Sequence, residues 1–280
     1  MRPHKTRHGQ ATASVSIDRL EARTLCSAAS EGAALVSVQT SPPPIVTGGY
    51  VGGANWTNVF KQYLYDIGRG SELYGCSIDG TDGIPWINTN QVSLLFSADV
   101  VVDAEDLSVR GLSVRNYSVS SVQSAGEFYT AATWSLARPL ANDAVVIELN
   151  CDAPDRVHVR NSQIFVDGDY DNVPGGTYRK RVYSLPGDAA SDGRVNAIDL
   201  AGVRRGLGGS TGGVIYSAWY DVDASGRINA LDLAAVRQRF GTRVPTGEPA
   251  AVAGTASPSS LSALASSPTK ELFASQPILA

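Results

Sequence analysis

Hydrophobic residues alternate with polar or small residues along much of the middle of the chain. Val92, Leu94 and Phe96 show this alternation, and it returns around Trp134 and from Val145 to Leu149. A period of two is typical of strands that bury one face. Asp-Gly, Asn-Asp and Gly-Gly pairs separate these segments and indicate turns. The pattern predicts an antiparallel β-sandwich of about 140 residues.

One helix is predicted ahead of the strands. Its apolar residues recur at helical spacing, with Asn55 available as N-cap and Gly68 as terminator. The residues that share its apolar face are Val59, Phe60, Tyr63, Leu64 and Ile67.

A duplicated segment follows the predicted sandwich. Residues 188–205 align with residues 221–238 at an offset of 33, and 10 of the 18 aligned positions are identical. Each copy is an acidic loop followed by an amphipathic helix. No helix is expected before either loop, because residues 183–187 and 217–220 read as extended or turn-like. The apolar face of the two helices is formed by Leu200, Val203, Leu207, Leu233, Val236 and Phe240.

Both acidic loops fit the template of a twelve-residue calcium loop. Calcium prefers six to eight oxygen ligands, which such a loop offers from positions 1, 3, 5, 7, 9 and 12 around a glycine at position 6. The glycines are Gly193 and Gly226, and positions 7 contribute only backbone carbonyls. The candidate ligands are Asp188, Asp192, Arg194, Asn196, Asp199, Asp221, Asp223, Ser225, Arg227, Asn229 and Asp232. The sequence therefore predicts two Ca²⁺ ions.

Two positions depart from the template. Ala190 leaves position 3 of the first loop without a side-chain oxygen, and Ser225 places a neutral hydroxyl at position 5 of the second. All six acidic residues between Pro186 and Arg243 nevertheless occupy ligand positions. Because clustered carboxylates repel one another, we expect folding of this segment to depend on calcium and loss of the metal to leave the sandwich intact.

A simpler interpretation of the loops is ordinary turn chemistry, with Asp199 and Asp232 capping the helices that follow. Duplication of the matched positions favours the metal interpretation. The residues at position 8, Val195 and Ile228, are expected to pair the two loops through a short β-bridge.

A third acidic turn, at Asp167, Asp169 and Asp171, fails the same template. Its sixth position is Asn172 and its twelfth is Tyr178. A solvated turn is the better account of it.

The repeated pattern G-D-x-x-x-D-G-x-V-N-x-x-D-L, present at Gly187 to Leu200, resembles a type I dockerin. The second copy differs at Tyr220, which replaces the leading glycine, and at Ser225. The resemblance implies a cohesin-like partner that contacts loop positions 10 and 11 and the exposed helix faces, in either of two orientations. The residues carried over are Ala197, Ile198, Arg204, Arg205, Ala230, Leu231, Arg237 and Gln238. The alternative makes Ile198 and Leu231 core residues and leaves the arginines solvated.

Two further resemblances concern the rest of the chain. Residues 95–100 and 133–136 are similar to immunoglobulin-like domains that often precede dockerins in exported bacterial proteins. Charged residues interrupt any apolar signal centre near the N-terminus. That segment is instead similar to the L-E-x-R-x-L-x-S-A leader of secreted proteins, which implies an extracellular or cell-surface location. The matching residues are Leu20, Glu21, Arg23, Leu25, Ser27 and Ala28, with Cys26 in place of leucine.

The fold class predicted is mainly β, an immunoglobulin-like antiparallel β-sandwich with a small α-helical dockerin domain. The expected divisions are a disordered leader and linker (1–43), the sandwich (44–185), the dockerin (186–243) and a disordered tail rich in alanine, serine and proline (244–280). Of three cysteines, Cys76 and Cys151 either pair or remain two separate buried thiols.

Composition argues against several functions. A net charge of −4 with 18% charged residues provides no basic surface for nucleic acid. No apolar run reaches the roughly 20 residues of a membrane span. His158 is the one histidine outside the leader, so the sequence favours a non-catalytic protein with no catalytic residues. The alternative is an accessory or enzymatic role in polysaccharide degradation, in which the sandwich binds glycan or hydrolyses it through Glu127 and Glu148.

Overall fold

The computed structural model describes residues 41–249 apart from residues 81–82, 126–129, 153–156 and 163. The predicted leader, Glu127 and the tail beyond residue 249 lie outside the described residues. Those described belong to one compact unit that begins at Ser41. In chain order its elements are β1 (Val46–Gly52), α1 (Asn58–Asp66), β2 (Gly70–Ser71), β3 (Gly75–Ser77), β4 (Gln91–Phe96), β5 (Val100–Val101), the 3₁₀ helix η1 (Ala104–Asp106), β6 (Leu107–Gly111), β7 (Val119–Ala125), β8 (Ala131–Leu136), β9 (Asp143–Asn150), β10 (His158–Val159), β11 (Thr177–Ser184), α2 (Ala197–Gly206) and α3 (Ala230–Gln238).

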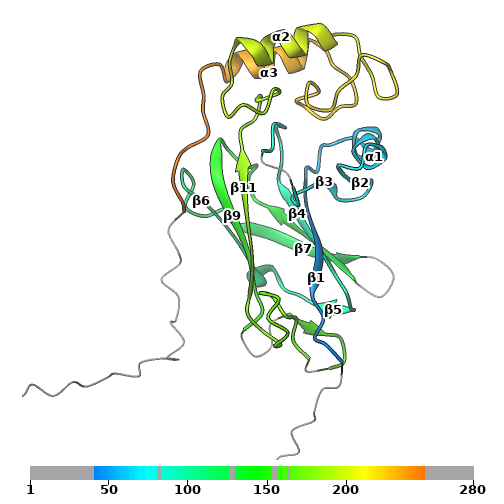
Figure 1. Cartoon of the computed structure of the whole chain (residues 1–280), viewed down its shortest axis with the longest axis vertical. Coiled ribbons are helices and arrows are strands. Elements are labelled where there is room, and N and C mark those ends of the chain that lie inside the picture. Colours follow the sequence, from blue (N-terminus) through cyan, green and yellow to red (C-terminus); the bar gives the residue numbers. More distant parts are fainter. Residues whose placement is uncertain (1–40, 81–82, 126–129, 153–156, 163, 250–280) are drawn as a thin grey trace, which may run out of the picture. The chain divides into compact units, whose positions relative to one another are not determined.

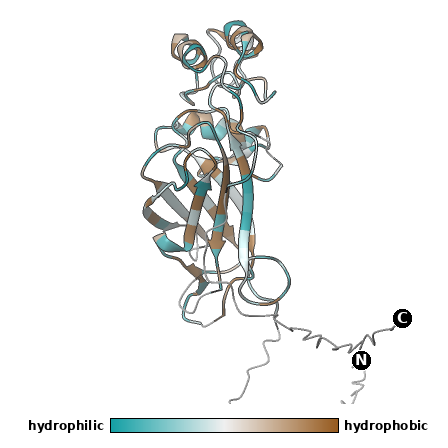
Figure 2. Ribbon diagram, turned by 90° about the vertical axis from the view of Figure 1, so that its left-hand side faces the viewer, coloured by the Kyte–Doolittle hydropathy of each residue, from teal (hydrophilic) through white to brown (hydrophobic). Residues whose placement is uncertain are grey.

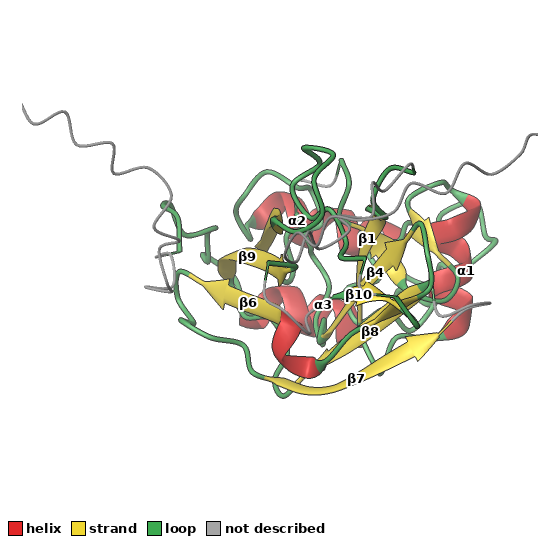
Figure 3. Cartoon of the chain, turned by 90° about the horizontal axis from the view of Figure 1, so that it is seen from below, coloured by secondary structure: helices red, strands yellow, loops and turns green. Residues whose placement is uncertain are grey.

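The strands form antiparallel sheets, and the protein is mainly β, as the alternating pattern predicts. The described strands make a six-stranded sheet of order β2-β3-β1-β4-β8-β7, a three-stranded sheet of order β11-β9-β6, and a small pair of β10 with β5. Figure 3 shows β6 and β9 in one layer and β7 and β8 in another. The immunoglobulin-like topology stays a prediction.

The two larger sheets share one hydrophobic core. Leu94 of β4, Trp134 of β8 and Ile147 of β9 each have no exposed surface and belong to the same buried cluster. Hydrophobic and hydrophilic residues alternate along the strands in Figure 2. Since each such side chain contributes about 1.5–3 kcal/mol when buried, this core is the main source of the sandwich's stability.

Helix α1 forms where predicted, but with a different N-cap. Thr57, not Asn55, has the extended backbone of a cap, and its Oγ1 accepts a hydrogen bond from the Phe60 N–H at 3.3 Å. Phe60 and Leu64 are buried, whereas Val59 and Ile67 of the predicted apolar face are exposed. Spacing alone made that face too wide.

Helices α2 and α3 follow the two acidic loops and contact each other (Figure 1). Val203 and Val236 are fully buried between them, as predicted. Leu207 and Phe240 are 40% and 55% exposed, so the predicted apolar face is too long by one turn in each helix. Each helix ends before or at that residue, which removes it from the packed stripe.

The predicted β-bridge between the two loops is wrong. Val195 exchanges backbone hydrogen bonds with Gly241 and Thr242, which follow α3. Ile228 does the same with Gly208 and Gly209, which follow α2. The first loop thus pairs with the segment that follows α3, and the second loop pairs with the segment that follows α2. Each copy of the repeat is therefore hydrogen-bonded to the other.

The sandwich and the helical region share one hydrophobic core. Trp86, which is 1% exposed, packs at 5.4 Å and 5.6 Å ring distances against Trp56 and Phe60, and its indole N–H donates to the Ala218 carbonyl at 2.8 Å. The same hydrophobic cluster continues into the duplicated segment through Val222 and Ile228. The shared core changes the expectation that one part unfolds without the other.

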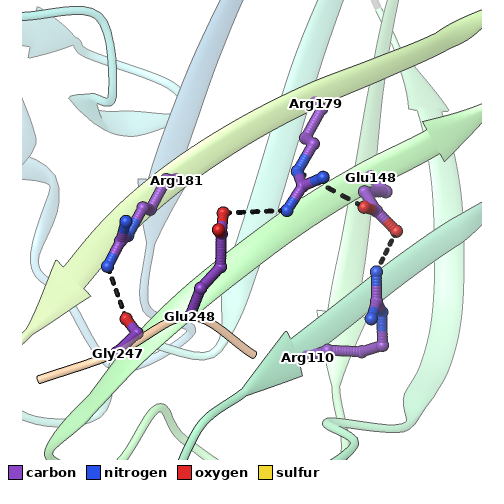
Figure 4. A network of polar contacts seen from close by, with 6 residues as sticks. All are labelled: Arg110, Glu148, Arg179, Arg181, Gly247 and Glu248. Atoms are coloured by element: carbon purple, nitrogen blue, oxygen red, sulfur yellow. Dashed lines mark hydrogen bonds and ion pairs between the residues drawn. The ribbon is translucent and has the colours of Figure 1, made fainter. Parts of the chain in front are cut away.

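Residues 244–249, which composition placed with the tail, contact the three-stranded sheet. Arg181 donates to the Gly247 carbonyl at 2.6 Å, and Arg179 pairs with Glu248 at 3.0 Å (Figure 4). Pro249 is buried. This stretch ties the end of the helical region to β11, so the described chain is ordered further than predicted.

Cys76 and Cys151 are both buried and are not joined by a disulfide. Burial, together with nearby carboxylates, raises the pKa of the Cys151 thiol to about 12. That residue is therefore a packed apolar side chain and not a nucleophile.

Candidate metal centres

The first acidic loop gathers three carboxylates. Asp188, Asp192 and Asp199 each offer one oxygen, and these oxygens lie within 4.8 Å of one another. Asp188 and Asp199 are buried, and Asp192 is exposed. An oxygen cluster of this size has the chemistry of a hard divalent cation site.

The second loop repeats the arrangement. Oxygens of Asp221, Asp223 and Asp232 again lie within 4.8 Å of one another. Asp221 and Asp232 have no exposed surface, and Asp223 is half-buried. The equivalent acidic positions of the two copies therefore converge, although the second loop uses position 3 where the first uses position 5.

Position 1 holds each loop in shape. The Asp188 carboxylate accepts from the backbone N–H groups of Asp192 and Gly193 at 3.0 and 2.9 Å. The Asp221 carboxylate accepts from those of Ser225 and Gly226 at 3.0 and 2.7 Å. Both loops therefore wrap their backbone around the carboxylate that opens them.

The backbone turns sharply at the same two positions of each loop. Gly193 and Gly226, at position 6, have φ of +79° and +83°, which is the role the template gives to glycine. Ser191 and Ala224, at position 4, both have φ of +57°. Sequence reasoning missed position 4, because neither serine nor alanine signals a left-handed residue.

The simpler interpretation, in which position 12 caps the helix, describes a real contact. Asp199 accepts from the Asn196 N–H at 2.7 Å and Asp232 from the Asn229 N–H at 2.8 Å, and both form capping boxes. The other oxygens of these two carboxylates accept from the N–H groups of Ala190 and Asp223 at 2.8 and 3.1 Å. Each oxygen has a second lone pair, so these hydrogen bonds leave acceptor capacity for a cation. Capping and metal binding are compatible at these residues.

The remaining predicted ligands form hydrogen bonds within the loops, and their role toward a metal stays a prediction. The Asn196 and Asn229 side-chain oxygens accept from the N–H groups of Ile198 and Leu231 at 2.7 Å, so they serve as helix N-caps. The Ser225 hydroxyl donates to the Arg227 carbonyl at 3.1 Å. Arg194 has an exposed side chain, and its backbone forms a bridge with residue 243. The carboxylates are the principal candidate ligands, and the neutral groups hold the loop backbone in shape through hydrogen bonds.

Sequence reasoning also missed Tyr216. Its hydroxyl donates to Asp221 Oδ2 at 2.5 Å, and both side chains are buried. No spacing rule connects this residue to the loop, because the tyrosine lies between the two copies of the repeat.

Burial changes how these carboxylates titrate. Desolvation raises the pKa of Asp188 and Asp232, and it raises the pKa of Asp221 to about 7 despite the opposing hydrogen bond from Tyr216. Buried anions without a counter-charge are costly, and a bound cation relieves that cost. The electrostatics of both loops therefore favour a divalent cation.

The raised pKa of Asp221 predicts a pH-dependent calcium affinity at the second loop. Calcium requires the ionised carboxylate, so affinity should fall about tenfold per pH unit below 7 and level off above about 8. In the metal-free protein, raising the pH has an unfavourable effect, because it lowers the stability of the fold. The folded-state pKa exceeds the unfolded one, so ionisation between about pH 4 and 7 destabilises the metal-free fold. Calcium titrations from pH 5.5 to 8 in an Asp199→Asn chain measure the effect, and a constant affinity across that range would contradict it.

The third acidic turn also brings its carboxylates together. Oxygens of Asp167, Asp169 and Asp171 lie within 4.8 Å of one another, and Asp167 is buried where a solvated turn was predicted. Asp167 accepts from the backbone N–H groups of Tyr170, Asp171 and Asn172. These donors satisfy the buried carboxylate, and the turn lacks an acidic twelfth position.

The residues assigned to partner binding all lie on the surface. Ile198 and Leu231 are 62% and 66% exposed, which excludes the alternative that they are core residues. The full exposed set is Ala197, Ile198, Arg204, Arg205, Ala230, Leu231, Arg237 and Gln238. The two helices therefore present matching apolar tips beside arginines.

The class of this region is a duplicated loop-helix module with two acidic centres, joined to a β-sandwich. Residues 186–241 match the family model described as dockerin type I domain, which confirms the resemblance read from the sequence. Dockerin domains generally bind calcium. No curated protein matches the chain.

Two solved structures are similar to parts of this chain. Both are interface mutants of a type II cohesin–X–dockerin complex from Acetivibrio cellulolyticus. The C-terminal mutant is 14% identical, with 52% of this chain and 92% of that chain covered and a TM-score of 0.22. The N-terminal mutant is 13% identical, with 51% and 90% covered and a TM-score of 0.21.

Proposed function

We propose that this chain is a non-catalytic, calcium-binding attachment protein. Its residues 186–243 would bind a cohesin-like domain in an extracellular or cell-surface assembly. The observation that carries the proposal is the pairing of two converging carboxylate triads with two exposed helix faces of matching composition. Calcium at the millimolar levels typical outside cells suits loops with reduced ligand sets. None of the helices described is long and apolar enough to span a membrane.

The ligands proposed for the two Ca²⁺ ions are the acidic triads, supplemented by backbone carbonyls. Asp188, Asp192 and Asp199 would hold one ion, and Asp221, Asp223 and Asp232 the other. Bound calcium supplies positive charge between carboxylates that otherwise repel. Ala190 removes one oxygen from the first loop, so we expect that site to be the weaker one.

Glycan hydrolysis is not supported as a second function. Glu148 pairs with Arg110 and Arg179, so this carboxylate is committed to structural ion pairs (Figure 4). Glu127 lies outside the described residues. A polysaccharide partner for the sandwich stays a prediction from the sequence.

The exposed apolar tips provide a test of the cohesin proposal. Because the two copies are nearly identical, Ile198→Asp or Leu231→Asp alone should lower affinity for a type I cohesin by no more than a few fold. Either variant keeps one intact binding face. The double variant should lose at least about thirtyfold, since a buried charge replaces each interface anchor. Calorimetric titration with calcium present measures the affinities.

The matched control is Val214→Asp, an exposed apolar residue outside both helices. It should bind like the parent chain. Undiminished binding of the double variant would place the partner surface elsewhere.

A further inference from the structure

The second calcium loop lies against the start of α1 in the sandwich. Thr57 donates twice to the Ala224 carbonyl, from its backbone N–H at 3.1 Å and from its Oγ1 at 3.2 Å. Packing there is tight, since a Cβ atom added at Gly226 would lie 2.7 Å from Val59 Cγ2. Residues 167 positions apart therefore meet at the loop.

The segment before β4 makes a further hydrogen bond to the second loop. The backbone N–H of Ile87 donates to the Val222 carbonyl at 2.9 Å. Val222 and Ala224 occupy loop positions 2 and 4, on either side of Asp223. The Val222 carbonyl lies in the peptide plane that precedes Asp223, and the Ala224 carbonyl lies in the plane that follows Ala224. The sandwich therefore holds the backbone on both sides of the Asp223–Ala224 pair whether or not a cation is present.

The residue that receives the two bonds from Thr57 has the unfavourable backbone conformation of the loop. Ala224 has φ of +57°, a left-handed conformation that alanine rarely adopts. Such a conformation persists only when its surroundings enforce it. The two hydrogen bonds from Thr57 add support for it from outside the loop.

The first loop has the same backbone requirement without the same support. Ser191, at the equivalent position 4, also has φ of +57°. Among the described residues, no hydrogen bond joins residues 188–199 to residues 45–183. This loop instead borders a cavity of about 320 Å³, lined in part by Ile84, Asp188 and Val244. Within the described part of the chain, the first loop is tied to the sandwich only at its entrance, where the Gly187 N–H donates to the Pro85 carbonyl at 2.8 Å. Among the described residues, hydrogen bonds from the sandwich to position 4 are a property of the second loop alone.

We propose that the sandwich is a working part of the second calcium site. Thr57 is a positioning residue that holds loop 221–232 in its ion-binding conformation before the ion arrives. The second loop consequently fills at a lower calcium concentration than the first. The inference rests on the calcium binding proposed above. According to this inference, removing the Thr57 hydroxyl weakens calcium binding at the second loop and leaves calcium binding at the first loop unchanged.

The test isolates each site in the full chain. In an Asp199→Asn background the second site remains, and in an Asp232→Asn background the first remains. Thr57→Ala is added to each, and calcium affinity is measured by isothermal titration calorimetry. We expect three- to tenfold weaker binding in the first background, as loss of one net hydrogen bond implies, and an unchanged affinity in the second. Thr57→Ser keeps the hydroxyl and should restore the parent affinity.

Thr57 also caps α1, so a general loss of stability must be separated from loss of positioning. A merely structural role would lower both affinities or neither, and either result overturns the inference while calcium binding stands. Thr57→Val, which keeps the side-chain shape and lacks the hydroxyl, should repeat the alanine result. Failure of the parent chain to bind calcium overturns the proposed function itself, and the inference with it.

Discussion

Replacing Asp199 and Asp232 together by asparagine should abolish calcium-dependent stabilisation of the whole chain. At calcium concentrations near 100 times the dissociation constant, each ion contributes about 2.7 kcal/mol to the stability of the folded state. Losing both ions should therefore lower Tm by about 10 °C or more in a chain of this size. Asparagine keeps one acceptor oxygen for the helix cap, so the change reports the metal more than the cap. Thermal unfolding in millimolar calcium and in excess chelator measures it.

A matched control removes the same number of negative charges from the sandwich. Asp169→Asn with Asp171→Asn removes two carboxylates from the third acidic turn, which lacks an acidic twelfth position. The difference between calcium and chelator should be retained in that variant. A control that lost the difference, or a test variant that kept it, would contradict the assignment of the ions to the duplicated loops.

Trp86→Ala should destabilise both halves of the molecule at once. The indole fills the space between Trp56, Phe60 and Trp219 and donates to the Ala218 carbonyl, so truncation leaves a large cavity and an unsatisfied acceptor. Changes of this kind cost about 3–5 kcal/mol. Because the core is continuous, urea unfolding should remain a single transition at a lower midpoint, with tryptophan fluorescence and circular dichroism coincident.

Trp86→Phe provides the matched variant. It keeps most of the ring packing and loses the indole N–H, so a cost of about 1–2 kcal/mol is expected from the unpaired carbonyl and the smaller ring. Two separate transitions in the Trp86→Ala chain, one of them at the parent midpoint, would show that the two halves fold independently.

The sequence predicted the acidic loops well because their information is local. Asp188, Gly193 and Asp199, with their counterparts in the second copy, follow a fixed spacing, and duplication removes most of the chance of coincidence. The strands were predictable for the same reason, since large apolar residues recur at every second position of β4 and β9, although β9 also buries the residues between them.

What the sequence could not supply depends on contacts between distant segments. Asn55 and Thr57 are both acceptable N-caps, and the choice is made where Thr57 reaches the second loop. Tyr216 lies outside any motif; its ring packs against Tyr63, and its hydroxyl donates a hydrogen bond to Asp221. The predicted bridge between Val195 and Ile228 failed because the chain after each helix returns to pair with the opposite loop. Tertiary partners decided each case.

The number of calcium ions bound per chain tests the central claim most directly. Isothermal titration of the metal-free full chain with calcium, checked by mass spectrometry under native conditions, should give two ions, one of them released by each of the Asp199→Asn and Asp232→Asn substitutions. Retention of no ion at millimolar calcium, with the same melting temperature in calcium and in chelator, would contradict the account.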